Sequence, residues 1–467
     1  MVSHNLKKKE GAPMSMKARA ALGKATVLEK IIYGIGDIGA NFGWTFMTLF
    51  ITMYYTDSVG LSTAFAGTMM LITRIFDGVS DVVFASIMEK SKFKMGKIRP
   101  WFLIAAPLMG IGIYLCFHVP MSLSLQGRQI YSFATYFFMA VISYTIYSIA
   151  YTGFLPLMSQ DSNDRNIISA MSRIFTMAGI LVMNIITPIL LGVWGGERVP
   201  EAWGNLTTIY AIFCTVMVAM MGLCIKEKPV DGAEGEITET EKPPLKAVLG
   251  TVFKVKYFWI LAVMFIMFYL STGLNGISTY FYRDVLGNLD LLGTMSFLGV
   301  VPTLIVMPFV PAVFKKLGKR KTCIISLSVT ILSDLIAILM PHQFIMFCIS
   351  RVLNSVFKIP YSAAVFIFVA DLVDHVWQRN SIRAESFISM ASSVGQKIGA
   401  GFGGALVGWG LTWAGYNAAS TMQSSATQFG ITLIFFGIPM LCNLIALIMV
   451  NLWRIGDPAP GLATKAE

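Results

Sequence analysis

The sequence predicts an all-α polytopic membrane protein, with twelve transmembrane helices in two six-helix bundles, from three observations. Hydrophobic residues make up 55% of the 467-residue chain and charged residues only 13%, whereas about 25% charged residues is usual in soluble proteins. Apolar runs follow one another from residue 31 to residue 453, and each is long enough to cross a bilayer, which takes about 20 residues. One long polar segment divides these runs into two groups of six.

The apolar runs predict the transmembrane spans in chain order. The predicted spans of the first half are 31–57, 62–88, 101–120, 130–156, 168–193 and 205–226. Those of the second half are 255–282, 289–314, 321–341, 344–371, 383–414 and 427–453. The runs are continuously apolar rather than alternating, so helices rather than strands are expected.

Polar segments mark the expected domain boundaries. The segment 226-KEKPVDGAEGEITETEKPPLK-246 lacks the apolar residues needed to pack and is typical of a linker. The predicted domains are an N-terminal tail (1–30), an N-terminal bundle (31–226), a central linker (227–254), a C-terminal bundle (255–453) and a C-terminal tail (454–467).

The positions of the cations explain the net charge of +11. Lys and Arg gather in the N-terminal tail and in the loops 89–100 and 315–322, which is the bias of cytoplasmic loops. Both termini are therefore expected in the cytoplasm and the protein in the plasma (inner) membrane. The excess charge needs no nucleic-acid partner. The first thirty residues lack the apolar core of a removable signal peptide.

The sequence contains no enzymatic or metal-binding motif. Its six cysteines form no CxxC pair, and its four histidines form no HExxH cluster. A Walker-type phosphate loop is also missing, which excludes an ATP-driven pump. We therefore expect a protein that is not an enzyme and has no resident cofactor.

The two halves resemble each other in their basic loops. The loop 89-EKSKFKMGKIRP-100 and the loop 315-KKLGKRKT-322 both centre on Gly-Lys. A six-plus-six duplication is the architecture of the major facilitator fold, in which the substrate binds near the membrane midplane between two bundles that rock about it. The sequence therefore predicts alternating access.

Charged residues inside the second span, 73-TRIFDGVSD-81, predict a cation site. Charges in hydrocarbon are costly and are therefore informative. Asp77 and Asp81 lie four residues apart on one helical face, and Arg74 precedes Asp77 by three. Two carboxylates with the Ser80 hydroxyl can hold a sodium ion or share a proton. The alternative is a static Arg–Asp network that joins helices.

Lys397 lies deep in the eleventh predicted span, within 391-ASSVGQKIGAGFGG-404, where its side chain cannot easily reach water. It is expected to neutralise Asp77 and Asp81 when no cation is bound. Arg173, nearer the start of its span, is expected to contact the substrate or to serve a structural role.

The first span carries 33-YGIGDIGANFGW-44. No strand precedes its glycines, so it is not a dinucleotide fingerprint. Asp37 and Asn41 share a face and are expected to direct polar groups toward a cavity. Tyr33 and Trp44 offer ring faces on which a sugar can stack, or they pack in the core.

Five motifs occur in a fixed order along nearly the whole chain. They are Tyr33-Gly34-x-Gly36-Asp37, Tyr55-Thr56-Asp57, Arg74-Ile75-Phe76-Asp77, Gly96-Lys97-x-Arg99-Pro100-Trp101 and 370-ADLVDHVWQRNSIRAES-386. Together they resemble the glycoside-pentoside-hexuronide:cation symporter family of the major facilitator superfamily, which includes melibiose and glucuronide carriers. The resemblance implies a cation-coupled sugar transporter.

The resemblance also implies roles for individual residues. Asp77 and Asp81 coordinate the coupling ion, with Thr145 as a further oxygen ligand. Sodium-using relatives have Asn where this chain has Ser80, so both H⁺ and Na⁺ stay open. Relatives that bind neutral galactosides have acidic residues at the positions of Asn41 and Ser148.

The same galactoside-binding relatives have a stacking Trp at the position of Thr152. The predicted cavity, with Arg173 and Lys397, is therefore less negative, which favours an anionic sugar such as a glucuronide or sulfosugar. A neutral pentoside or oligosaccharide stays an alternative, as does a lysophospholipid transporter of the same superfamily.

The expected cycle begins with cation binding in the outward-facing state, followed by sugar binding near Asn41, Ser148 and Arg173. Salt bridges on the cytoplasmic side are expected to hold that state and to break on inward opening. The residues predicted to form them are Lys97, Arg99, Asp161, Asp371, Asp374, Arg383 and Glu385. The expected partners are a small-molecule sugar, the coupling cation and membrane lipid, and the protein is expected to be a monomer.

Overall fold

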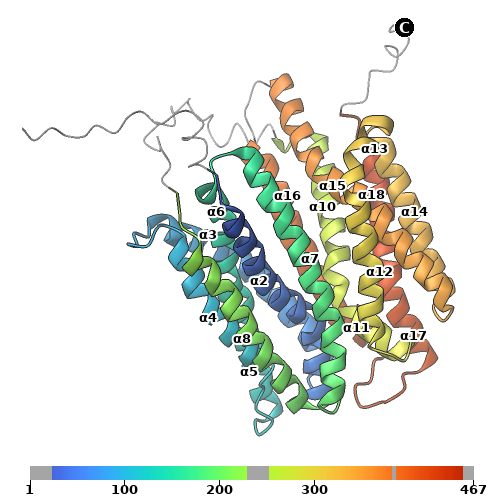
Figure 1. Ribbon diagram of the computed structural model, residues 1–467. Helices are drawn as coiled ribbons and strands as arrows, with labels where there is room; N and C mark the ends of the chain where they lie inside the picture. The colour runs from blue at the N-terminus through green and yellow to red at the C-terminus, as the bar shows by residue number, and fades with distance from the viewer. Residues whose placement is uncertain (1–23, 229–251, 381–384, 456–467) are drawn as a thin grey trace, which may run out of the picture.

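The computed structural model describes residues 24–228, 252–380 and 385–455, and long helices make up most of them (Figure 1). Among these residues the only extended pairing is one isolated bridge between Phe93 and Gly96. The helices run side by side, and loops join them at two ends (Figure 1). The predicted all-α architecture is confirmed.

The N-terminal half forms six consecutive helical rods in the described residues. Their bounds are α2 Val27–Met53 with the π-helical turn η1 Tyr54–Ser58; α3 Thr63–Lys90; α4 Arg99–Cys116; α5 Leu125–Phe137, η2 Phe138–Ser143 and α6 Tyr144–Met158 as one rod; α7 Ser162–Val193; and α8 Pro200–Cys224.

The C-terminal half repeats this arrangement. Its rods are α10 Lys256–Gly273 with η3 Leu274–Gly276, α11 Ile277–Tyr280 and η4 Phe281–Val285; α12 Leu291–Val306 with η5 Met307–Phe309 and α13 Val310–Leu317; α14 Lys319–Leu339; α15 Phe344–Asn380; α16 Glu385–Trp413; and α17 Ser425–Thr432, η6 Leu433–Gly437 and α18 Ile438–Leu452. Within the described ranges the rods match the predicted spans in number and order.

Nine of the rods in the described part of the chain are long and apolar enough to cross a membrane. The other three, α2, α3 and α16, are also long but carry charged and small residues in their middle sections. These three helices bring Trp44, Asp77, Asp81 and Lys397 to one space between the halves. Their low hydropathy therefore reflects the site rather than a different topology.

Several helices begin before the predicted spans because capped polar turns continue them beyond the apolar run. At the start of α2, the Thr26 hydroxyl accepts the Glu29 N–H, while the Glu29 carboxylate accepts the Thr26 N–H. This reciprocal capping box satisfies two backbone donors. The Asp161 carboxylate caps α7 by accepting the Asn163 N–H at 2.9 Å.

An arginine in each basic loop fastens that loop to the last helix of its own half. Arg99 donates from Nε to the Gly222 carbonyl at 2.5 Å and from Nη2 to the carbonyl of Leu223 at 2.6 Å. Arg320 donates from Nη2 to the Asn451 carbonyl at 2.7 Å. Both guanidinium groups thereby satisfy the free carbonyls at a helix C-terminus. The likeness of the two loops in sequence thus corresponds to a likeness in structure.

The two halves meet closely at one end of the molecule, which we call the closed end. Here α3 begins and α16 ends, and small residues bring their backbones together: a Cβ on Gly67 would lie 2.6 Å from the Ala405 carbonyl oxygen. Thr63 and Thr412 join the same helices through a 2.6 Å hydroxyl contact. Such small residues permit close helix approach where lipid gives no hydrophobic driving force.

The opposite end, where α2 begins and α18 ends, is the open end. One buried apolar cluster includes side chains from both halves, among them Phe50 and Tyr280 near the closed end. A second cluster belongs to the C-terminal half alone and includes Phe368 and Trp453 near the open end. The shared core therefore seals only the closed end.

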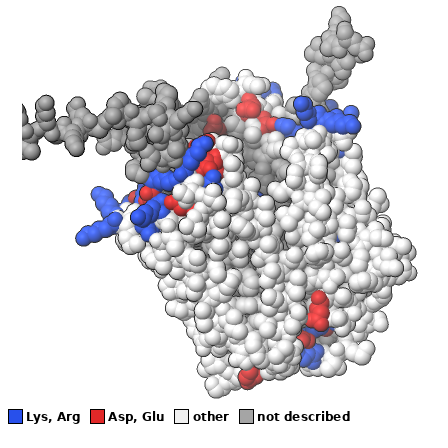
Figure 2. Space-filling view, viewed as in Figure 1, with Lys and Arg blue, Asp and Glu red and all other residues white. Residues whose placement is uncertain are grey.

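Charged side chains gather at the open end of the face shown in Figure 2, and a broad band without charge covers its side. Large apolar side chains such as Ile212, Phe297 and Leu332 are exposed on the described surface. Apolar exposure on this scale fits contact with lipid rather than water.

We predict that Gly67→Ala loosens the closed end, because its Cβ would press on a backbone oxygen that cannot rotate away. Overpacking of this kind costs about 1–3 kcal/mol. The measurement is the maleimide labelling rate of a cysteine placed at Thr56, whose side chain is 1% exposed, in a background without native cysteines. Faster labelling is expected.

Gly192→Ala is the matched control, since a Cβ there meets nothing within 4 Å. Equal labelling rates in the Gly67→Ala variant and this control would contradict the role of the small-residue contact.

Candidate functional site

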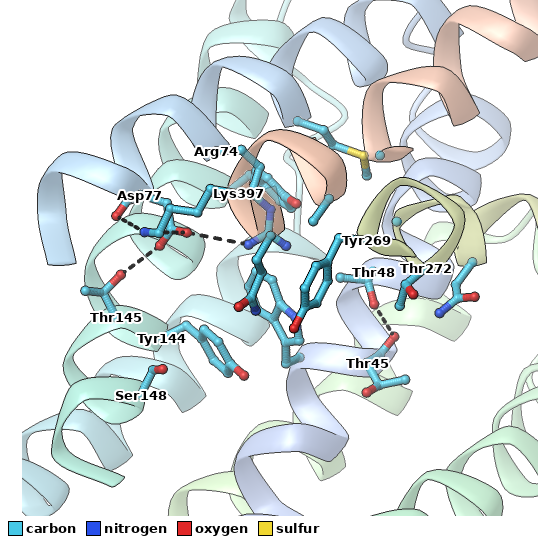
Figure 3. Close-up of a pocket in the computed structure, with 18 of the residues that line it drawn as sticks. Thr45, Thr48, Arg74, Asp77, Tyr144, Thr145, Ser148, Tyr269, Thr272 and Lys397 are labelled. Atoms are coloured by element: carbon cyan, nitrogen blue, oxygen red, sulfur yellow. Dashed lines mark hydrogen bonds and ion pairs between the residues drawn. The ribbon is translucent and has the colours of Figure 1, made fainter. Parts of the chain in front are cut away.

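A cavity of about 440 Å³ lies between the halves and is lined by α2, α3, α5 and α6 on one side and by α10, η3 and α16 on the other. Its charged lining consists of Arg74, Asp77, Asp81 and Lys397. Its hydroxyl and amide lining includes Thr45, Thr48, Tyr144, Ser148, Thr272 and Gln396. Figure 3 shows the labelled members of both sets around one space.

Lys397 reaches from α16 to both carboxylates of α3. Its ammonium nitrogen lies 2.6 Å from Asp81 Oδ2 and 3.4 Å from Asp77 Oδ2, and it donates to the Asp77 carbonyl oxygen at 2.8 Å (Figure 3). The Asp81 side chain is 42% exposed and that of Asp77 only 14%, so the pair is accessible from the Asp81 side. The ammonium lies between the two carboxylates that the sequence predicts for cation binding.

Two hydroxyl groups complete the surroundings of Asp77. Thr145 of α6 donates to Asp77 Oδ1 at 3.1 Å, and its oxygen lies 3.2 Å from the Ser80 hydroxyl oxygen. Ser80 donates to the Asp77 carbonyl at 3.0 Å. Carboxylate, hydroxyl and carbonyl oxygens are the ligands that hard cations prefer. All five predicted cation-site residues therefore lie together.

Arg74 lies on the preceding turn of α3 and contacts Asp77. Its Nη1 lies 3.7 Å from Asp77 Oδ2, and its guanidinium lies 4.6 Å from the Trp44 ring centroid. Trp44 stacks on Tyr144 with centroids 4.2 Å apart. These rings form an aromatic platform beside the charged group, and sugars bind such ring faces through their apolar C–H surfaces.

Asp37 lies away from the cavity lining, in a buried polar cluster of the N-terminal half. Its carboxylate accepts hydrogen bonds from Asn41 (2.7 Å), Tyr147 (3.0 Å), Ser172 (2.9 Å) and Thr176 (2.7 Å). The side chain is 6% exposed. The cluster joins α2, α6 and α7, so Asp37 and Asn41 have structural partners in this conformation.

Of the other four predicted substrate residues, one lines the cavity and three do not. Ser148 lines the cavity, whereas Tyr33 is 1% exposed and donates to the Tyr151 carbonyl at 3.0 Å. Thr152 donates to the carbonyl of Ser148 at 2.9 Å. Arg173 is exposed. Among the six, only Ser148 is thus in the lining in this conformation.

The predicted gating residues contact their own half wherever a described partner is recorded. Lys97 and Arg99 donate backbone N–H groups to Glu227 at 2.8 Å each. Asp161 pairs with Lys24 at 2.7 Å, and this hydrogen bond lowers the pKa of the Asp161 carboxyl. Asp371 pairs with Lys319 at 2.7 Å.

No contact is recorded for Asp374 or for the exposed Glu385 within the described residues, and Arg383 lies outside them. Salt bridges that hold the opposite conformation are not expected in this one, so the gating assignment stays a prediction.

A charged cluster near the closed end joins the halves, and the sequence reading missed it. Arg283 of η4 lies 2.5 Å from Asp57 Oδ2 and 2.8 Å from Asp284 Oδ2. Tyr416 donates to Asp57 Oδ2 at 2.9 Å. The Asp57 side chain is fully buried and that of Arg283 is 10% exposed. Asp57 belongs to the motif Tyr55-Thr56-Asp57, but its partner Arg283 lies 226 residues further along the chain. No pattern in the sequence connects the two residues.

The C-terminal half carries a second charged group that the sequence reading also missed. Arg351 and Lys358 of α15 line two further cavities beside the first one, and Asp334 of α14 lines the smaller of these two. The two cations lie seven residues apart on one helical face. Their position inside an apolar span was a signal of the same kind as that of Lys397.

Comparison with solved structures identifies the fold. The chain shares its fold with a D-xylose–proton symporter (TM-score 0.63, 13% identity, 91% of this chain and 97% of that one). A nucleoside transporter gives a TM-score of 0.64 at 15% identity, over 91% of this chain and 100% of that one. The fold is that of major facilitator transporters, as predicted.

The sequence then gives the family. Residues 32–457 match the MFS/sugar transport protein family, and the chain belongs to it. Relatives include an isoprimeverose transporter of Lactiplantibacillus pentosus, 25% identical over 94% of this chain and 91% of the relative. A glucuronide carrier protein homolog of Escherichia coli is 25% identical over 90% of each chain. The resemblance to glycoside:cation symporters is confirmed, and the chain is a multi-pass membrane protein.

We predict that Arg283→Gln opens the closed end, because it leaves the buried Asp57 carboxylate without its cation. Breaking a buried pair in this way costs about 3–5 kcal/mol. The measurement is the distance distribution between spin labels at Glu201 and Met422, which lie on different halves. A new population at longer distance is expected.

The control is Arg128→Gln, since Arg128 donates to the carbonyl of Val59 at 2.7 Å within one half. Superimposable distance distributions for Arg283→Gln and wild type would show that this cluster does not hold the closed end together.

Proposed function

We propose that this protein is a secondary transporter that couples the uptake of a sugar or glycoside to a cation, H⁺ or Na⁺, by alternating access. The observation that carries the proposal is the Lys397 ammonium between Asp77 and Asp81, 2.6 Å from the latter. Family membership and the glycoside-transporting relatives support the substrate class.

We assign the open end to the cytoplasm and the protein to the plasma (inner) membrane. The support is the placement of the basic loops, because Lys92, Lys94, Lys97, Lys315 and Lys316 follow or precede helix ends at the open end. Loops rich in Lys and Arg stay on the cytoplasmic side. Both termini are then cytoplasmic, and the present conformation faces inward.

Lys397 acts as an internal substitute for the coupling cation in this mechanism. Na⁺ at Asp77 and Asp81 takes the place of the ammonium, and a proton neutralises one of the two carboxylates, so in either case the ammonium is held less strongly and leaves. The contact that joins α3 to α16 at mid-height is then broken, so ion occupancy changes the free-energy difference between the two conformations. A ligand shifts such an equilibrium only through its differential affinity for the two states.

The sugar binds in the cavity next to the ion site. Trp44, Tyr144 and Tyr269 offer ring faces, and Thr45, Ser148 and Gln396 offer hydrogen-bonding groups. A lining with this many charged and hydroxyl groups suits a polyhydroxy compound better than an acyl chain. The cavity chemistry thus favours a sugar over the lysophospholipid alternative.

We predict that Asp77→Asn abolishes gradient-driven accumulation of sugar but spares exchange. The amide neither takes up a proton nor supplies the charge that Na⁺ needs, whereas exchange requires only that the loaded carrier reorient. The measurement is uptake of a labelled glycoside by proteoliposomes under a proton or a sodium gradient, and counterflow without a gradient.

Asp290→Asn, a change on an exposed loop carboxylate, is the control and should behave as wild type. Wild-type accumulation by Asp77→Asn would remove Asp77 from coupling. A wild-type protein that neither accumulates nor exchanges any sugar would refute the proposed function itself.

A further inference from the structure

A second cavity, of about 420 Å³, adjoins the first on its C-terminal side. Thr45, Thr272 and Asn275 line both cavities, so the two spaces meet at these residues. Asn275 lies in η3, the 3₁₀ turn that interrupts the helical rod after α10. Interrupted helices at mid-membrane depth are typical of substrate sites in transporters.

Two cations of α15, Arg351 and Lys358, line this second cavity. The Arg351 Nε is buried and has no hydrogen-bond partner among the described residues. Lys358 donates to the Ser271 hydroxyl at 3.3 Å, and neither cation lies within ion-pair distance of a described carboxylate. They differ in this from Lys397, which is paired on both sides.

One buried carboxylate lies near the two cations but is already satisfied by amides. Asp334 accepts from the Asn354 side-chain amide at 2.6 Å and from that of Asn443 at 3.3 Å, and it is 2% exposed. It lines a small cavity together with Lys358 and Arg351. The group therefore carries two cations against one carboxylate.

The charges of the two cavities differ in their balance. In the first cavity Arg74 and Lys397 balance Asp77 and Asp81. The second cavity is lined by Arg351 and Lys358 and, in the described part of the chain, by no carboxylate, and Asp334, which lines the small cavity beside it, can balance only one of the two cations. The Arg351 Nε is buried and has no partner among the described residues. An uncompensated charge in the membrane interior is costly, so an anion that enters this space gains more there than it would in water.

We propose that Arg351 and Lys358 bind the anionic group of the substrate, so that the transported compound is a sugar acid with a carboxylate or sulfonate. This inference rests on the proposed function and assigns its substrate class. The planar guanidinium of Arg351 suits the paired oxygens of such a group. The sugar ring then lies at the junction near Asn275, within reach of the aromatic platform.

This placement also links substrate binding to the coupling ion. A cation at Asp77 and Asp81 adds positive charge to the joined cavities, which strengthens the binding of an anion in the neighbouring space. The anion contacts α15 of the C-terminal half, whereas the ion sits on α3 of the N-terminal half. Substrate and ion together therefore engage both bundles.

The test uses two ligands that differ only at the C6 group, methyl β-glucuronide and methyl β-glucoside. Their affinities are measured by competition in counterflow and, separately, by thermal stabilisation of the purified protein in detergent. Wild type is expected to bind the glucuronide at least about tenfold more tightly than the glucoside. Arg351→Gln and Lys358→Gln are each expected to lose that preference while the glucoside affinity stays unchanged.

The controls separate charge from folding. Lys316→Gln removes an exposed cation and should leave the glucuronide preference intact. Lys358→Arg keeps the positive charge and should keep part of the glucuronide preference. Arg351→Lys serves in the same way if Arg351→Gln does not give a single gel-filtration peak.

The outcomes for this inference and for the proposed function are distinct. A wild type that prefers the glucoside, or glutamine variants that keep the glucuronide preference, would overturn the sugar-acid inference and leave sugar symport intact. If no sugar is exchanged, sugar symport fails. In that case, thermal stabilisation of the wild type by glucuronide that is lost in Arg351→Gln still supports an anion site. If glucuronide does not stabilise the wild type, the anion site is overturned as well.

Discussion

The Lys397 ammonium from one bundle lies between two carboxylates of the other, and this ion group is the central constraint on the molecule. Charges at this depth are costly unless they are paired, so Asp77, Asp81 and Lys397 bind one another unless something replaces a partner. The only groups able to replace the ammonium are cations, which makes the contact between α3 and α16 sensitive to ion occupancy. The Thr145 hydroxyl donates to the Asp77 carboxylate and keeps it oriented, and the Ser80 hydroxyl beside it donates to the Asp77 backbone carbonyl.

The rest of the architecture places this ion group at a point where the halves separate. Toward the closed end, α3 and α16 approach through small residues, and the apolar core is shared by both bundles. Toward the open end, the C-terminal half has its own core, and the recorded contacts of both basic loops stay within their own halves. The Asp57–Arg283 cluster supplies polar contacts near the closed end. The ion group thus lies between a sealed region and an accessible one, which is the position required for alternating access.

The sequence predicted those site residues that are charged and lie inside apolar spans, where an unpaired charge is costly. Asp77, Asp81 and Lys397 stand out for this reason, and the helix period places the two carboxylates on one face. The same argument applies to Arg351 and Lys358, which also lie inside an apolar span. The orientation of Asp37 was not predictable, because every face of α2 contacts protein and the sequence does not show which face meets the cavity. Partners that lie far apart in the chain, such as Asp57 and Arg283, need the fold itself.

The most direct test of the account is the affinity of the sugar-free protein for its coupling cation, with and without Lys397. Binding is measured in detergent by calorimetric titration with NaCl and, in sodium-free buffer, by proton uptake with a pH indicator. If the ammonium competes with the cation, Lys397→Gln binds the coupling cation at least about tenfold more tightly than wild type, as expected when one close charge is removed. Equal affinity in the two proteins would contradict competition at this site, and with it the coupling mechanism.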